Sequence, residues 1–337
     1  MTLRRRALRA GVWLGLVAAA AVAPAAAQLG SVAFPSSGSA AAQPAFLRGV
    51  LLLHSFEYGR AAQAFREAQQ ADPGFALAYW GEAMTYTHPI WNEQDLPAAR
   101  AALARLGATP EARAAKAPTE RERGYLAAVE VLYGEGPKER RDTLYQRAME
   151  RLAAAHPEDL EARALDALAL MGLSQGTRNV PTYVRAGAIA LDVLRANPEH
   201  PGAAHYVIHA FDDPVHAPLG LPAARAYSKI APDAPHAQHM TTHIFLALGM
   251  WSDVVAQNTV AAGPDSARWR PGHYTSWLGY GLLQQGRVRE AAALLDRVTA
   301  ALPVWRAESR RAYLLLDARP SPGGRSMPTS PFPRRDG

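Results

Sequence analysis

Residues 58–73 decide the fold, and they read YGRAAQAFREAQQADP. A small residue, a large apolar residue, a second small residue and a proline follow one another at intervals of four, three and five positions: Ala61, Phe65, Ala68 and Pro73. Intervals of three and four place these side chains on one helix face, and the proline marks the end of the helix. The same intervals return at residues 291–303 and, with smaller side chains, at residues 186–198. A recurring pattern of this kind indicates stacked helical repeats.

The pattern resembles the tetratricopeptide repeat (TPR), a helix-turn-helix unit of 34 residues. The resemblance implies an all-α fold, a TPR-like right-handed α-solenoid of antiparallel helix pairs, over residues 44–317. A looser pair is expected at residues 119–157. The other units are expected to start at or near Ala42, Ala76, Glu158, Pro201, Pro235 and Gly272.

Three stretches are also similar to a group of uncharacterised secreted bacterial TPR proteins with a His-rich central segment. They are HYVIHAFDDP (205–214), GLPAARAYSKIAP (220–232) and HAQHMTTHIFLALGMW (236–251). This resemblance implies an exported TPR protein and indicates no reaction. The TPR fold implies a binding or scaffold role, with a protein or peptide partner in the concave groove of the solenoid.

Both ends of the chain differ from the repeats in composition. Residues 1–27 combine basic residues, an apolar run at 11–22 and a small-residue stretch at 25–27, which is typical of a cleaved signal peptide. An uncleaved membrane anchor is the alternative. Cleavage predicts a periplasmic or secreted protein without stable membrane insertion. Residues 28–43 are expected to be a flexible leader and residues 318–337 a disordered tail.

The charge balance argues against a nucleic-acid partner. The formal net charge is +6, but residues 1–27 carry four positive charges and residues 318–337 a net three, which leaves residues 28–317 near −1. No basic face is therefore expected to bind a phosphate backbone. The sequence has no cysteine, so disulfides, thiolate metal ligands and a cysteine nucleophile are excluded.

Histidines gather in one part of the chain, where seven of eleven lie between His200 and His243. Residues three and four apart share a helix face. His205 and His209 are therefore expected to stack, and so are His236, His239 and His243. The TPR resemblance implies that positions 2, 5, 9, 12 and 13 of each first helix face the groove. His205 and His239 then occupy position 5, and His209 and His243 occupy position 9.

Imidazoles from two neighbouring helices, about 8–10 Å apart, could meet on one ion. Histidine is a good ligand for Zn, Cu or Fe, and this ligand set does not choose among them. The expected metal residues are His205, His209, His236, His239 and His243, with Asp213 completing the shell or orienting a ring. Secondary groove residues are His54, His88, His273 and Asp212.

Other interpretations of the histidines stay open at this point. A metalloenzyme would use the same cluster with one open coordination position. Stacked histidines could also recognise an acidic peptide or small anion, or only form hydrogen bonds between helices. The catalytic residues are unknown, because no convincing Ser–His–Asp set or unambiguous general base appears in the sequence. Trp80 and Trp91 are expected to pack in the core and the groove.

Overall fold

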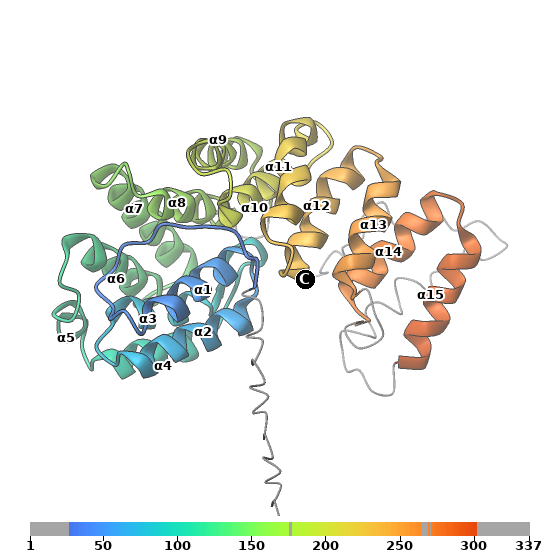
Figure 1. Cartoon of the computed structure of the whole chain (residues 1–337). Coiled ribbons are helices and arrows are strands. Elements are labelled where there is room, and N and C mark those ends of the chain that lie inside the picture. The colour runs from blue at the N-terminus through green and yellow to red at the C-terminus, as the bar shows by residue number, and fades with distance from the viewer. Residues whose placement is uncertain (1–26, 175–176, 264–268, 270, 302–337) are drawn as a thin grey trace, which may run out of the picture.

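The computed structural model describes residues 27–174, 177–263, 269 and 271–301, and most of them are helical. Consecutive helices pack as hairpins and each hairpin packs on the next, which makes an all-α solenoid (Figure 1). The helices are α1 (Gln43–His54), α2 (Tyr58–Ala71), α3 (Ala76–Met84), α4 (Leu96–Leu106), α5 (Pro110–Ala114), α6 (Glu120–Leu132), α7 (Lys138–Ala155), α8 (Leu160–Gly172), α9 (Val180–Ala196), α10 (Pro201–Ala210), α11 (Ala217–Ile230), α12 (Pro235–Ala247), α13 (Trp251–Ala261), α14 (His273–Gln284) and α15 (Val288–Ala301).

The predicted repeat register agrees with the helix starts. Helices α3, α10 and α12 begin at the predicted residues, and α1, α8 and α14 begin within two residues of them. The side chain of Phe65 on α2 explains why the two helices packed against it have glycine at the contact. A Cβ atom added to Gly49 or Gly81 would lie only 2.7 or 2.3 Å from the Phe65 ring, so only glycine lets α1 and α3 approach α2 this closely.

A short hairpin interrupts the second unit, where the repeat pattern predicts only helices. Strands β1 (Thr87–His88) and β2 (Glu93–Gln94) pair antiparallel around the 3-10 helix η1 (Pro89–Trp91). Lys138 and Arg141 of α7 bind the side chains of Asn92 and Gln94 at 2.7 Å each. The hairpin is therefore fastened to the third unit as well as to its own.

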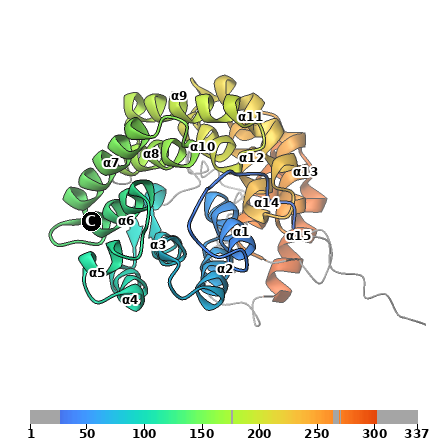
Figure 2. The same ribbon diagram turned by 60° about the vertical axis from the view of Figure 1, so that its left-hand side comes forward.

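The solenoid curves back on itself. Figure 2 shows the arc of helices from α6 to α13 around the first unit, and α1 packs against α10 although about 150 residues separate them. The inner face of the arc at α10 is thus covered by the turn between α1 and α2. The sequence predicted an open concave groove at this point, and covering by a distant unit is not encoded in the period of one repeat.

Residues 28–42 are held against the repeats, in contrast to the flexible leader predicted from their composition. Leu29 and Phe34 are buried, and the Phe34 ring contacts the rings of Phe46, Trp80 and Tyr125 at centroid distances of 5.3, 5.7 and 5.0 Å. The backbone N–H of Ser31 donates to the Glu199 carbonyl at 2.9 Å. Burial of these two apolar side chains holds the segment in place, although its average composition is polar. We call residues 28–42 the strap.

The predicted signal peptide up to residue 26, the end of the expected repeat domain at 302–317 and the predicted tail lie outside the described residues. Within the described ranges, no helix is both long enough and apolar enough to cross a bilayer.

Candidate metal centre

Three histidines from two neighbouring repeat units form the first group, which we call centre A: His205 and His209 of α10 and His236 of α12. One ring nitrogen of each lies within 4.8 Å of the others. The i, i+4 spacing on α10 stacks the first two rings at a centroid distance of 4.8 Å. His236 reaches them from the first turn of α12, with its ring centroid 5.0 Å from that of His205.

The Nε2 atoms of centre A are buried without a hydrogen-bond partner among the described residues. Buried polar atoms are almost always paired, because an unpaired one loses its bonds to water without replacement. Three such atoms from three side chains, directed into one small space, need an occupant. Their burial and chemistry fit a metal ion, which imidazole binds through its unprotonated nitrogen.

The backbone of His54 sets the orientation of one ring. Nδ1–H of His205 donates to the His54 carbonyl at 2.7 Å, which leaves the lone pair on Nε2 and turns it into centre A. Histidines that bind metals commonly donate their other ring N–H to a carbonyl or carboxylate in this way.

Aromatic rings cover centre A on the side of the first unit. The Phe56 ring contacts those of His205, His209 and His236 at centroid distances of 4.2, 5.6 and 5.7 Å. Its backbone φ of 54° is unusual for a residue other than glycine and is held by the turn between α1 and α2. Trp91 of η1 lies edge-on to His209 and His236 and is 45% exposed, so it is less buried than the predicted core packing.

Burial keeps these imidazoles neutral. It lowers the pKa of His205 to about 3, because the charged ring would lose its hydration. Burial also holds the pKa of His209 and His236 well below its usual range, and the neighbouring histidines lower it further. Neutral imidazole is the form that binds transition metals.

A second group, centre B, repeats the arrangement one unit further along: His239 and His243 of α12 with His273 of α14. One ring nitrogen of each again lies within 4.8 Å of the others. His273 is the exposed member of the group, although the protein around its ring still lowers its pKa to about 4 by desolvation; burial holds the pKa of His239 well below its usual range. The ring of Trp277 contacts the His239 and His243 rings at 4.9 and 4.4 Å.

Two polar side chains orient the rings of centre B. Asn258 donates through Nδ2 to the Val254 carbonyl, so its Oδ1 must accept from Nδ1–H of His239, at 2.8 Å. The carboxylate of Asp212 accepts from Nδ1–H of His243, also at 2.8 Å. With both rings neutral, both Nε2 atoms carry lone pairs, and these face each other at 3.2 Å.

A third group, His54, His200 and Glu161, is fully buried, and its members face one another. His200 accepts the Ala203 N–H on Nδ1, so its proton lies on Nε2, 3.2 Å from Glu161. His54 Nε2 lies 2.6 Å from the other carboxylate oxygen, and its Nδ1 lies 2.9 Å from the Tyr206 hydroxyl. Burial alone would raise the pKa of Glu161, but the two imidazoles hold it well below its usual range. His200 Nε2 and Glu161 Oε1 face each other as an ion-pair contact without hydrogen-bond geometry. Because each ring nitrogen nevertheless faces a protein partner, we interpret this group as structural.

The structure thus divides the predicted single cluster into two. His205 and His209 meet His236 instead of His239 and His243, which meet His273. Asp213 reaches neither centre, because its carboxylate accepts from Arg178 and from His216 at 2.9 Å each. The ring-orienting role predicted for Asp213 belongs to Asp212, which binds His243. The secondary groove residues His54 and His88 also lie outside both centres, and the His88 ring stacks on Tyr58 at 4.0 Å.

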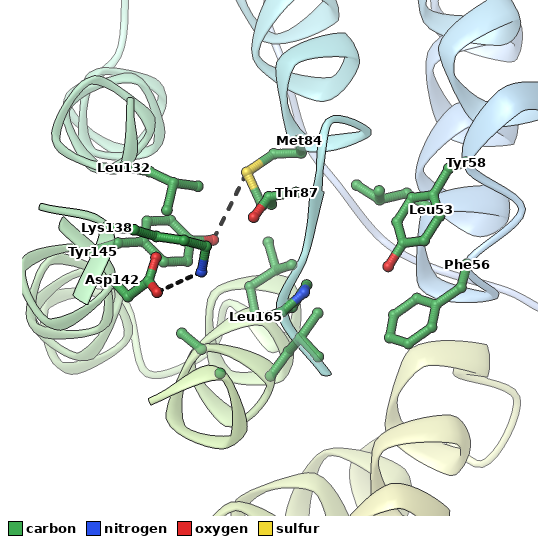
Figure 3. A pocket seen from close by; sticks show the side chains of 14 residues that line it. Leu53, Phe56, Tyr58, Met84, Thr87, Leu132, Lys138, Asp142, Tyr145 and Leu165 are labelled. Carbon is green, nitrogen blue, oxygen red and sulfur yellow. Dashed lines mark hydrogen bonds and ion pairs between the residues drawn. The ribbon is translucent and has the colours of Figure 1, made fainter. Parts of the chain in front are cut away.

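A small cavity of about 30 Å³ lies behind Phe56, on the side of the hairpin and α6 to α8 (Figure 3). Apolar side chains such as Leu53, Met84 and Leu165 line most of it, with the Lys138–Asp142 ion pair at one edge. This volume holds a few water molecules at most. It is too small for an organic substrate beside centre A.

Comparisons with known proteins do not assign a family. No protein-family model matches this chain. No curated protein sequence matches it either. Among solved structures, the chain is similar to the crystal structure of the TPR domain of P58(IPK), at 13% identity over 82% of this chain and 87% of that one, with a TM-score of 0.26. That score is too low to support an argument, so the helical-repeat fold rests on the helices and contacts described above.

Proposed function

We propose that this chain is an exported helical-repeat binding protein that holds a divalent transition-metal ion at centre A. One observation carries the proposal: the buried Nε2 atoms of His205, His209 and His236 converge without a partner among the described residues. Zn²⁺, Cu²⁺ and Fe²⁺ all accept imidazole nitrogen, and Cu²⁺ stands highest in the general affinity order.

The competing interpretations of the histidines have less support. An acidic peptide or anion would need imidazolium, but burial keeps His205, His209 and His236 neutral. Hydrogen bonding accounts for both nitrogens of His54, and His200 Nε2 faces the Glu161 carboxylate at 3.2 Å, but the Nε2 atoms of centre A face only one another.

A metalloenzyme at centre A is the second candidate. Three protein ligands leave a coordination position open, as in catalytic zinc sites. Glu57, which follows Phe56, accepts the backbone N–H of His236 at 3.2 Å, so that oxygen is engaged in a structural bond. Binding rather than catalysis is therefore the leading proposal.

Export and a scaffold role belong to the same proposal. The predicted cleavage site precedes Gln28, whose backbone N lies 2.7 Å from the Asp233 carboxylate. A new α-amino group at Gln28 would form an ion pair there. N-terminal sequencing of secreted material should begin at or next to Gln28, and an intact Met1 would contradict export by cleavage. A protein or peptide partner is proposed because helical repeats present extended binding surfaces.

Metal content tests the proposed function directly. Elemental analysis of protein purified from its native compartment should find a transition metal in stoichiometric amount, and the double variant His209→Ala/His236→Ala should lose the ion from centre A. His156→Ala is the matched control, since His156 lies far along the chain beside Glu158. A wild-type protein that stays metal-free with Zn²⁺ or Cu²⁺ in excess would leave water as the occupant and overturn the proposal.

A further inference from the structure

We infer that the protein holds two metal ions side by side, one in centre A and a second in centre B. This extends the proposed function but rests on observations of its own, made on different side chains. It also assigns distinct roles to Asn258 and Asp212, which orient ligands without binding the ion.

The first observation is the contact between the two Nε2 atoms of centre B. Hydrogen bonds to Asn258 and Asp212 place the protons of His239 and His243 on Nδ1, so two lone pairs face each other at 3.2 Å. Lone pairs at that distance repel unless a metal ion or a shared proton lies between them, and the copper loading described below distinguishes the two. Two nitrogens bound to one tetrahedral ion by bonds of 2.0–2.1 Å are about 3.3 Å apart, which matches the observed separation.

The second observation is that the repeat itself relates the two centres. Each takes positions 5 and 9 of one unit and the first or second residue of the next first helix: His205, His209 and His236, then His239, His243 and His273. The same helix packing therefore presents the same three ligands twice. The preceding unit has Ala162 and Asp166 at these positions and Gly202 in the following helix, so the ligand set is limited to the two joints.

The two ions would lie close together. The rings of His236 in centre A and His239 in centre B have centroids 6.2 Å apart. An ion bound at 2.0–2.1 Å lies about 3 Å from the centre of its ligand ring, so the separation of the ions is at most about 13 Å. All six ligands are imidazoles, so two ions share a site with no carboxylate among its ligands. This ligand set favours Cu²⁺ or Zn²⁺ over Mg²⁺ or Ca²⁺.

Loading with Cu²⁺ tests the inference on the full mature chain. The wild type should bind two ions per chain, and its electron paramagnetic resonance spectrum should be broadened by dipolar coupling between them. His236→Ala and His273→Ala form a matched pair, since each removes the ligand at the start of one first helix. Each variant should bind one ion and give a sharp, uncoupled spectrum, while His156→Ala should behave as the wild type. Circular dichroism confirms that each variant is folded.

The outcomes separate this inference from the proposed function. One ion in the wild type, lost in His236→Ala and kept in His273→Ala, would retain centre A and overturn the second ion. Two ions without broadening would also overturn the pairing. If neither the wild type nor any variant binds metal, the proposed function itself is overturned, because centre A then binds no ion either.

Discussion

Single hydrogen bonds decide which nitrogen of each histidine is available. The carbonyl of His54, the amide of Asn258 and the carboxylate of Asp212 each accept from an Nδ1–H, and each leaves an Nε2 lone pair directed into a centre. Without an ion this arrangement is unfavourable, because a buried Nε2 atom that has no partner has also lost its hydrogen bond to water.

Replacing Asp212 tests the orienting role. Asp212→Ala should weaken metal binding at centre B by about 10- to 100-fold, the usual effect of losing a group that orients a ligand, and leave centre A unchanged. Titration with Zn²⁺ monitored by calorimetry measures both affinities. Asp253→Ala on the neighbouring helix is the control, because Asp253 is exposed. Equal affinity in the two variants would show that Asp212 plays no part in binding.

The raised pKa of Asp166, which is not one of the proposed metal ligands, predicts that the stability of the protein depends on pH. Asp166 is buried in α8, and burial raises its pKa from 3.8 to about 6, although Gln146 donates to it at 3.1 Å. A raised pKa means that the folded state holds the proton more tightly. The stabilisation is present below about pH 4 and is lost as the pH rises through 6.

Asp166→Asn should therefore raise the free energy of unfolding above pH 6 by on the order of 1–2 kcal/mol, with a difference that shrinks toward pH 4. Urea denaturation at pH 4, 5, 6 and 7 measures it. Asp296→Asn, at an exposed position of α15, should show no such trend. A pH-independent difference would contradict the assignment.

At the scale of elements, the approach of α10 to α1 positions centre A. A Cβ atom on Gly202 would lie 2.2 Å from Nδ1 of His54, so a side chain there must displace the ring whose residue orients His205. Gly202→Ala should destabilise the protein by about 1–3 kcal/mol through overpacking. It should also weaken centre A while leaving centre B intact.

The matched control is Gly59→Ala on α2, where an added Cβ atom meets nothing within 4 Å. That variant should be neutral or more stable by up to about 1 kcal/mol, because alanine favours helix more than glycine does. Thermal melts and metal titrations of both variants make the comparison. A Gly202→Ala protein with unchanged melting temperature and affinity would show that α1 does not set the geometry of centre A.

Much of the fold was predictable because one helix pair encodes its own register. Ala61, Phe65 and Ala68 mark a face, and Pro201 and Pro235 begin first helices as expected. The pairing of ligands was not predictable in the same way. Neighbouring first helices are staggered, so His236 lies level with His205 and His209, and that stagger depends on packing between helices rather than on spacing within one.

Contacts between distant parts of the chain were equally hidden from local patterns. Phe56 covers centre A from a turn about 150 residues away, and its identity alone gives no hint of that location. Phe34 fixes the strap, although the composition of residues 28–43 is that of a flexible linker. The sequence marks such approaches only at Gly49 and Gly202, where the structure shows another part of the chain too close for a side chain.

At the scale of the whole molecule, the strap bridges helices that lie far apart along the curve. Its backbone binds the Asp233 carboxylate, the Glu199 carbonyl and the Glu122 carboxylate in turn, from the joint of α11 and α12 back to α6. Phe34→Ala should lower the free energy of unfolding by about 3–5 kcal/mol, the usual cost of truncating a buried Phe.

Urea denaturation at fixed pH measures that change. Ser37→Ala is the control, because Ser37 is exposed and binds Glu122 through its backbone N–H, which alanine retains. Similar stability of the two variants would mean that the strap contributes little to holding the first unit inside the arc.

Centres A and B each draw two side chains from one repeat unit and the third from the next, so a bound ion would join two units. In a linear array, stability is approximately a sum of terms for each unit and for each junction between neighbours. Metal would strengthen the two junctions from α10 to α14 and leave the rest unchanged. Those three units would then unfold as one block. Amide hydrogen exchange along α10, α12 and α14 would slow together when metal binds. The concentration of available metal would therefore set the rigidity of this part of the curve.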